Sequence, residues 1–398
     1  MTEPMTYTVV TLGPSGAGKT VYLAALWQSL RLQHPRLGFY LTLDDPVLEH
    51  RLQRTYQQVA GPGEWPLPTD GREFPEWVFS VKVRSQHGQF TAMRVRYIDY
   101  AGDRLTDPQE GSPEQERLDR TMQDADALLA LLDGRKIRDM MRGNGDFLDH
   151  DMARVFGLLQ SCSGPIHFAI TKWDVLEAEY YSLKQVRERL LEHPEFRTLA
   201  TGRQNWRTAR MPVPPGRIRL IPTSSVGKNF AVLGADKLMH KLANARPRPQ
   251  HVDVCFAAVL PDLLANAVST MKEQERQEKK QRRSDARAER EAEGPNLLRT
   301  IADLLSAPAA AVLSSREVQV PVQALAAFMV ASAEGAADLI KLPPNELRKA
   351  RHLQKSFRKR NVDAVKDSAS AAQFVTHKLV ELLLEFERSP QNDGTILS

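Results

Sequence analysis

The sequence has little of several features that would each indicate a particular class of protein. Its 398 residues include only two cysteines, Cys162 and Cys255, and neither belongs to a CxxC pair. A disulfide framework is therefore excluded, and a reducing cytoplasm is the expected location. The uncharged stretch from Val318 to Ala333 contains Pro321 and falls short of the roughly 20 apolar residues that span a bilayer. No basic segment precedes an apolar run near the first residues, so we expect no secretory signal.

The net charge is also small. The 54 basic and 49 acidic residues give +5, which by itself does not indicate binding to nucleic acid. Basic residues are concentrated between Arg348 and Lys366, where Asp363 is the only acid. A solvated helical face is one interpretation of this stretch, and an acidic protein, a membrane surface or nucleic acid are its alternative partners.

What the sequence does contain is the composition of an ordinary globular chain, with 42% hydrophobic and 26% charged residues. Its length predicts two or three domains. We expect an α/β domain over residues 1–250 with two inserts, a helix followed by a loop near 37–76 and an irregular stretch near 197–216. Residues 251–293 are expected to form a long helix with a charged helical extension or a flexible linker, and residues 294–398 a helical C-terminal region. The final helix of that region is predicted to have Val375, Leu379, Leu382 and Phe386 along one face.

Short apolar runs alternate with helical patterns in the first part of the chain, which predicts an α/β fold with a six-stranded, mostly parallel sheet. The link between the second and third runs is too short for a parallel crossover, so one strand is expected to be antiparallel. The six predicted strands are Tyr7–Leu12, Trp77–Val83, Phe90–Ile98, Ala127–Leu132, His167–Thr171 and Ile218–Pro222. The predicted helices between them are Thr20–Leu32, Pro113–Ala125, Asp149–Gln160 and Ser182–His193.

A glycine-rich motif follows the first predicted strand and opens the first predicted helix. It matches GxxxxGK[ST] in full, from Gly13 to Thr20. Glycines let backbone N–H groups close on phosphate oxygens, and the helix N-terminus adds the positive end of its dipole. Lys19 is expected to reach the β and γ phosphates and Thr20 to offer a hydroxyl to Mg²⁺. The predicted phosphate-binding residues are Gly13, Ser15, Gly16, Ala17, Gly18, Lys19, Thr20 and Val21.

Two further motifs follow at the ends of later strands. The third strand ends in Asp99 and continues to Gly102, a DxxG pattern that places an acid where Mg²⁺ is held and a glycine N–H near a γ phosphate. The fifth strand ends in Thr171-Lys172-Trp173-Asp174, which matches [NT]KxD. A carboxylate at Asp174 can accept both N–H donors of the guanine edge, and the stem of Lys172 can cover the purine face.

In this order the motifs resemble the Ras-like small GTPases of the translation-factor-related P-loop class, over about residues 5–245. The opening motif, the Trp-Pro-Leu-Pro-Thr stretch from Trp65 and the helical tail more loosely resemble a bacterial double-GTPase group linked to conflict and defence systems. The resemblance implies a role for each matching position. Lys19 and Thr20 would bind phosphate and Mg²⁺, Asp99 would hold the metal through water, and Gly102 would contact the γ phosphate. Thr171, Lys172 and Asp174 would bind guanine, and Ser224 and Ser225 would form the last guanine loop.

The family also requires a threonine from a mobile loop that meets Mg²⁺ and the γ phosphate. Thr69 is the candidate, with Thr55 as the alternative. Where many members have a water-orienting glutamine directly after DxxG, this chain has Asp103. We therefore expect slow hydrolysis, or hydrolysis that needs a partner. The expected catalytic residues are Lys19, Thr69, Gly102 and Asp103, and the expected metal ligands are Thr20, Thr69 and Asp99.

The sequence thus predicts a molecular switch that binds GTP and GDP with Mg²⁺ and couples its state to a protein partner through its switch loops and helical C-terminal region. A nucleotide-bound scaffold that does not hydrolyse GTP is the alternative, and Asp103 favours it. An ATP-dependent P-loop enzyme is a third interpretation. It would need an acid directly after Asp99, and this sequence has none there. Arg72 or Arg104 could supply an arginine finger within the chain, and a solvated surface residue is the alternative interpretation of each.

Overall fold

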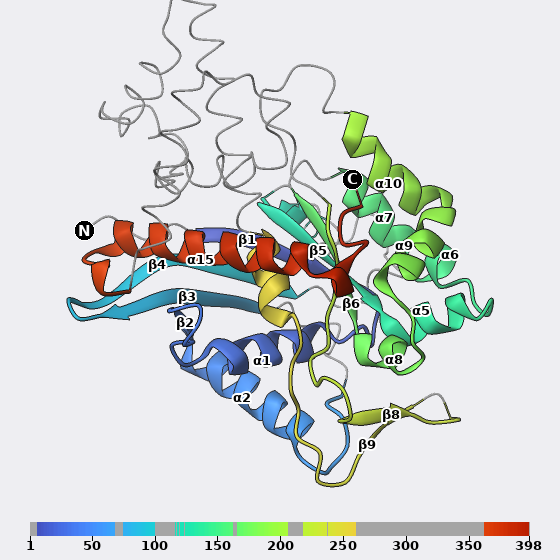
Figure 1. Ribbon diagram of the computed structural model, residues 1–398, viewed down its shortest axis with the longest axis horizontal. Coiled ribbons are helices and arrows are strands. Elements are labelled where there is room, and N and C mark those ends of the chain that lie inside the picture. The colour runs from blue at the N-terminus through green and yellow to red at the C-terminus, as the bar shows by residue number, and fades with distance from the viewer. Residues whose placement is uncertain are drawn as a thin grey trace, which may run out of the picture.

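The computed structural model describes residues 6–67, 75–99, 116–161 apart from 117, 119 and 123, 165–205, 218–259 apart from 237, and 362–397. These residues form an α/β fold around a seven-stranded, mostly parallel sheet (Figure 1). The strands of this sheet are β1 (Thr6–Leu12), β2 (Tyr40–Leu43), β3 (Glu76–Ser85), β4 (Gly88–Asp99), β5 (Ala127–Asp133), β6 (Ile166–Thr171) and β7 (Leu220–Pro222). A separate antiparallel hairpin consists of β8 (Ala231–Leu233) and β9 (Met239–Lys241).

The sheet has the strand order β2-β3-β4-β1-β5-β6-β7, and β3 is the strand that runs against its neighbours. The predicted hairpin and the single antiparallel strand are confirmed, but the predicted count of six strands is wrong. The seventh strand, β2, lies inside the interval that was expected to hold a helical insert and a loop. With four residues at the edge of the sheet, it is too short to give a period-two pattern, and its pairing with β3 fixes it.

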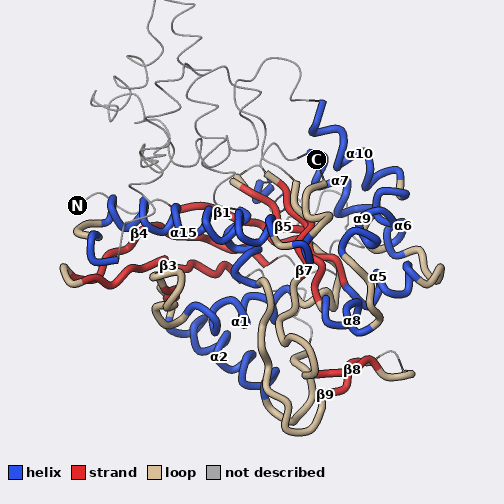
Figure 2. The backbone as a smooth tube through the Cα atoms, in the orientation of Figure 1, coloured by secondary structure: helices blue, strands red, loops and turns tan. Residues whose placement is uncertain are grey.

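Helices make up most of the remaining structure, as Figure 2 shows. They are α1 (Lys19–Leu30), α2 (Pro46–Ala60), α5 (Gly134–Met141), α6 (Phe147–His150), α7 (Ala153–Ser161), α8 (Trp173–Ala178), α9 (Leu183–Glu192), α10 (Pro194–Asn205) and α15 (Ser368–Arg388), with residues 252–259 also helical. The helix predicted over 149–160 is divided between α6 and α7. The interval 197–216 was expected to be irregular, but its first part continues α10, because Phe196, Leu199 and Ala200 are buried on one face.

Local side-chain chemistry fixes several helix ends. Asp45 accepts hydrogen bonds from Val47 N and Leu48 N, and Pro46 occupies the first helical position of α2. Ser182 and Gln185 form a capping box at the start of α9. None of the helices in the part of the chain that the structure describes combines the length and apolar character needed to cross a membrane.

Each face of the sheet is covered by its own layer of helices, and the alternation along β1 shows why. Val9 packs with α1, α15 and residues 252–259, whereas the next residue, Val10, packs with α5, α7, α9 and α10. Successive side chains of a strand point to opposite faces, so a strand covered on both sides must be apolar throughout. Every residue of β5 is buried for this reason.

The C-terminal helix α15 packs on the same sheet, across β3 and β4 (Figure 1). The predicted apolar face of this helix is confirmed, because Val375, Leu379, Leu382 and Phe386 are all buried. Beyond α15 the chain pairs with the edge of the sheet, where Leu220 N donates to Thr395 O at 2.7 Å. A largely buried ion pair, Arg219 Nε to Glu387 Oε1 at 2.8 Å, ties the two segments together. Residues 362–397 therefore share a hydrophobic core with the sheet.

Candidate functional site

The glycine-rich loop lies between the end of β1 and the start of α1. Gly18, the residue before the helix, has φ of 86°, and Gly16 has φ of 74°. These left-handed conformations are open to glycine at little cost and strained for other residues. The loop thus turns back on itself before the helix, and Ser15 and Gly16 are exposed at its tip while Ala17 is buried beneath it.

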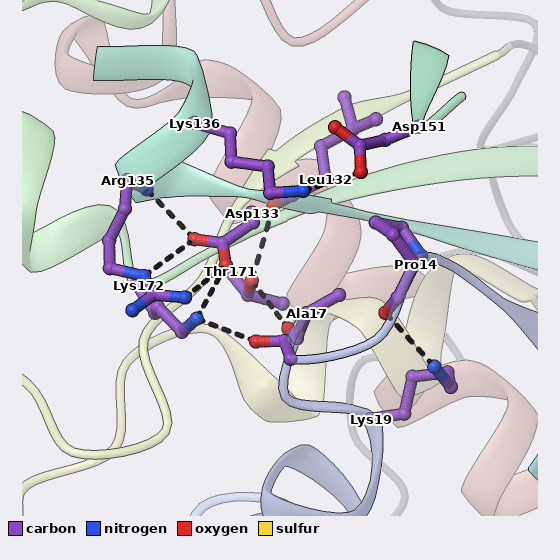
Figure 3. A network of polar contacts seen from close by, with 11 residues as sticks. Pro14, Ala17, Lys19, Leu132, Asp133, Arg135, Lys136, Asp151, Thr171 and Lys172 are labelled. Carbon is purple, nitrogen blue, oxygen red and sulfur yellow. Dashed lines mark hydrogen bonds and ion pairs between the residues drawn. The ribbon is translucent and has the colours of Figure 1, made fainter. Parts of the chain in front are cut away.

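Lys19 is buried at the first position of α1 and points back toward the loop. Its Nζ donates to Gly13 O at 2.9 Å and to Pro14 O at 3.2 Å, the latter drawn in Figure 3. The ammonium group is therefore held against two backbone carbonyls of the loop, at the N-terminal end of α1 where the helix dipole is positive. Val21, two residues further on, is half-buried against Phe230 and Val226.

Thr20 and Asp99 meet because β1 and β4 are parallel neighbours, with Thr11 opposite Asp99 in the register. The Thr20 hydroxyl donates to Asp99 Oδ2 at 2.8 Å. Asp99 is 2% exposed, and its other oxygen, Oδ1, has no hydrogen-bond partner among the described residues. Burial raises the pKa of this carboxyl above its usual value, although Lys19 and the Thr20 hydroxyl oppose the shift.

The Thr20 hydroxyl and the Asp99 carboxylate suit a magnesium ion that is also bound by water and phosphate, because a site made by the protein alone would need more ligands. Mg²⁺ takes hard oxygen ligands and is usually held by one or two protein groups together with water and phosphate. A hydroxyl beside a buried carboxylate with one unpaired oxygen matches that pattern. Within the described ranges, no group of three or more His, Cys, Asp or Glu side chains could hold a metal.

The segment Thr171-Lys172-Trp173-Asp174 connects β6 to α8 and lies directly against the glycine-rich loop. Thr171 Oγ1 donates to Ala17 O at 2.8 Å, and Lys172 Nζ donates to Gly16 O at 2.7 Å (Figure 3). Lys172 has φ of 51°, so its backbone is in the left-handed region that suits glycine. Two separate motifs of the sequence are thereby joined into one site at the carboxyl edge of the sheet.

Asp174 and Ser224 form the next part of the site. Asp174 is 7% exposed and accepts a hydrogen bond from Ser224 Oγ at 2.5 Å. Ser224 Oγ in turn accepts from Gly227 N at 2.8 Å, so the serine fixes the turn that follows β7. Ser225, the next residue, is half-buried. Burial raises the pKa of Asp174, while the Ser224 hydroxyl acts in the opposite direction.

The structure adds two residues to the site that the motifs do not include, Asp133 and Gly134. Asp133 ends β5 between the two motifs, and its fully buried carboxylate accepts from Lys172 Nζ at 2.6 Å and from Arg135 Nη2 at 3.0 Å. Burial by itself would raise the pKa of Asp133, but Lys172 and Arg135 hold that pKa below its usual value. An acid at the end of a third neighbouring strand was the signal in the sequence that could have located it.

Several of the expected site residues cannot be placed. Thr69, Gly102 and Asp103 lie outside the described residues, as do Arg72 and Arg104. The alternative Thr55 lies within α2, where its hydroxyl donates to Arg51 O at 3.0 Å. Most of the basic stretch also lies outside the described residues, which resume at 362.

No protein-family model matches the chain, and no curated protein matches it. The proposed function therefore rests on the geometry of the residues at the carboxyl edge of the sheet.

Proposed function

We propose that the chain is a guanine-nucleotide-binding switch with a Ras-like P-loop fold, which binds GTP and GDP together with Mg²⁺. The observation that carries this proposal is the contact between two motifs. Lys172 Nζ and Thr171 Oγ1 both bind backbone carbonyls of the glycine-rich loop, at Gly16 and Ala17. This contact brings a segment with the [NT]KxD pattern beside the loop expected to hold phosphates.

The sheet order supports the same proposal. The strand that carries the glycine-rich loop, β1, lies in the middle of the sheet between β4 and β5. Ligands of α/β sheets bind beyond the carboxyl ends of the strands, where the strand order reverses. The single antiparallel strand, β3, is the one that the resemblance to Ras-like proteins leads us to expect.

Each residue of the site has a part in nucleotide binding. The N–H groups at the start of α1 and the Lys19 ammonium would bind the phosphates, since charge of opposite sign is favoured there. Thr20 and Asp99 would hold Mg²⁺, which neutralises phosphate charge when bound. The Asp174 carboxylate, positioned by Ser224, would accept the two N–H groups of guanine, a pattern that adenine does not present.

Hydrolysis would be slow or dependent on a partner, because Asp103 stands where a water-orienting glutamine is expected. The same residue favours the second candidate function, a nucleotide-bound scaffold without turnover. Phosphate release over many turnovers, compared between wild type and Lys19→Ala, separates the two functions. Release that depends on Lys19 supports the switch, and release at the background rate in both supports the scaffold. In either case the switch loops and the helical C-terminal region are the proposed contacts for a protein partner.

Base recognition is tested by replacing Asp174 with asparagine. Xanthine carries an oxygen where guanine carries its amino group, so Asp174→Asn should weaken GTP binding and improve binding of xanthosine triphosphate. Asp151→Asn is the matched control, because Asp151 forms an ion pair with Lys136 Nζ at 2.6 Å and belongs to none of the motifs. An unchanged preference in Asp174→Asn would contradict the assignment of guanine.

A further inference from the structure

Asp133 lies between the glycine-rich loop and the Thr171–Asp174 segment in the described sheet. It ends β5, which pairs with β1 on one side and with β6 on the other. The glycine-rich loop follows β1, and the Lys172 segment follows β6. Since parallel strands end at the same edge, the carboxylate of Asp133 lies between these two segments (Figure 3).

The contacts of Asp133 divide between its two oxygens. Oδ1 accepts from Arg135 N at 2.9 Å and so caps the start of α5. Oδ2 accepts from Lys172 Nζ at 2.6 Å and from Arg135 Nη2 at 3.0 Å. The side chain of Asp133 has no exposure to solvent, so the two cations are the groups that compensate its charge.

The Lys172 ammonium is held at two points as a result. It donates to Asp133 Oδ2 at 2.6 Å and to Gly16 O at 2.7 Å, which bridges β5 and the glycine-rich loop. A lysine side chain has four rotatable bonds and high rotamer entropy, and a single backbone carbonyl is a weak restraint on it. A buried carboxylate is a stronger restraint, because charge-assisted hydrogen bonds are shorter and stronger than neutral ones.

From these contacts we propose that Asp133 is a positioning residue for nucleotide recognition, which acts by holding Lys172 against the loop and does not itself touch the nucleotide. This inference rests on the proposed function and names a residue outside its motifs. Without the carboxylate, the Lys172 stem would lose its fixed path across the face of the base, and the bridge between the loop and the base-binding segment would weaken.

The closest alternative role for Asp133 is structural, as the cap of α5 and the partner of Arg135. Asp133→Asn separates the two roles, because the amide oxygen can still accept from Arg135 N, while the charge that holds Lys172 is lost. Lys172→Met removes the ammonium and keeps the length of the apolar stem. If Asp133 acts through Lys172, its substitution should have no further effect once the Lys172 ammonium is gone.

The experiment measures dissociation of a fluorescent N-methylanthraniloyl-GDP in the presence of Mg²⁺ from wild type, Asp133→Asn, Lys172→Met and the double variant. We expect Asp133→Asn to accelerate dissociation at least tenfold, which corresponds to about 1.4 kcal/mol. The double variant should release the probe no faster than Lys172→Met. Glu387→Gln is the control for loss of a buried ion pair outside the motifs, and it should release the probe at the wild-type rate.

Four results would overturn the inference. Wild-type dissociation from Asp133→Asn, or effects of the two substitutions that multiply in the double variant, would show that Asp133 does not act through Lys172. If Asp133→Asn does not fold, Asp133→Ser keeps a capping oxygen, and failure of both to fold while Lys172→Met folds would make the role structural. Failure of the wild type to bind the probe would instead overturn the proposed function, and this inference with it.

Discussion

Substitution of Gly134 by alanine tests how closely α5 packs against the Thr171-Lys172 segment. Gly134 is the first residue of α5, directly after Asp133. A Cβ atom at this position would lie 2.4 Å from Thr171 O and 2.7 Å from Lys172 O. Both oxygens belong to the backbone, so no flexible side chain can move aside, and either α5 or the Thr171-Lys172 segment must shift.

The cost of this shift follows from the distances. An ordinary contact between a carbon and an oxygen is above 3 Å, so α5 and the Thr171-Lys172 segment must move apart by about half an ångström or more at a packed edge of the sheet. Overpacking of this kind typically destabilises a protein by about 1–3 kcal/mol. Because the displaced oxygens flank Lys172, we also expect Gly134→Ala to release guanine nucleotide faster than wild type.

A second glycine provides the matched control. Gly157 lies on the exposed side of α7, and a Cβ there would meet no atom within 4 Å. Alanine at an open helical position is favoured over glycine by about 0.5–1 kcal/mol. Urea unfolding should therefore show opposite signs for the same substitution, with Gly134→Ala destabilised and Gly157→Ala stabilised. Equal unfolding midpoints for the two variants would refute the packing of α5 against the Thr171-Lys172 segment.

Two further predictions concern the dependence of stability on pH. The pKa of Asp99 is raised, so its contribution to stability is present below about pH 3.8 and is lost as the pH rises through the higher folded value. Without nucleotide and Mg²⁺, the Asp99→Asn variant should therefore melt above wild type at pH 7, with a difference that shrinks in acid. A lower melting temperature at pH 7 would contradict this. The lowered pKa of Asp133 means that its contribution is present above about pH 3.8 and is lost as the pH falls through the lower folded value, so Asp133→Asn should show a shallower acid unfolding curve. Superimposable curves would count against the buried ion pairs.

Much of the sheet can be predicted from the sequence, because its central strands are apolar and bounded by clear turns. The run that forms β5 and the hairpin between β3 and β4 are examples. The short edge strand β2 could not be predicted, because four residues carry no periodic signal and its partner β3 lies more than thirty residues away. The position of α15 was equally out of reach. Its apolar face was evident, but the surface it covers is set by contacts across the whole chain.

The candidate site shows the same division. The glycine-rich loop and the Thr171–Asp174 segment are local patterns, so their residue types and spacing are enough to indicate a chemistry. Asp133 belongs to no pattern of that kind. It joins the site because three strand ends meet at one edge and because Lys172 reaches across from β6 to β5. A contact of this kind depends on tertiary structure, which is why sequence motifs alone do not reveal it.

The most direct test of the proposed function is equilibrium binding of GTP, GDP and ATP to the full chain in the presence of Mg²⁺, with Lys19→Ala as the reference without the phosphate-binding ammonium. We expect wild type to bind GTP and GDP and to discriminate against ATP, and we expect Lys19→Ala to bind all three weakly. Equal affinity of the wild type for ATP and GTP would contradict guanine recognition by Asp174, and binding that is unaffected by Lys19→Ala would contradict the nucleotide site itself.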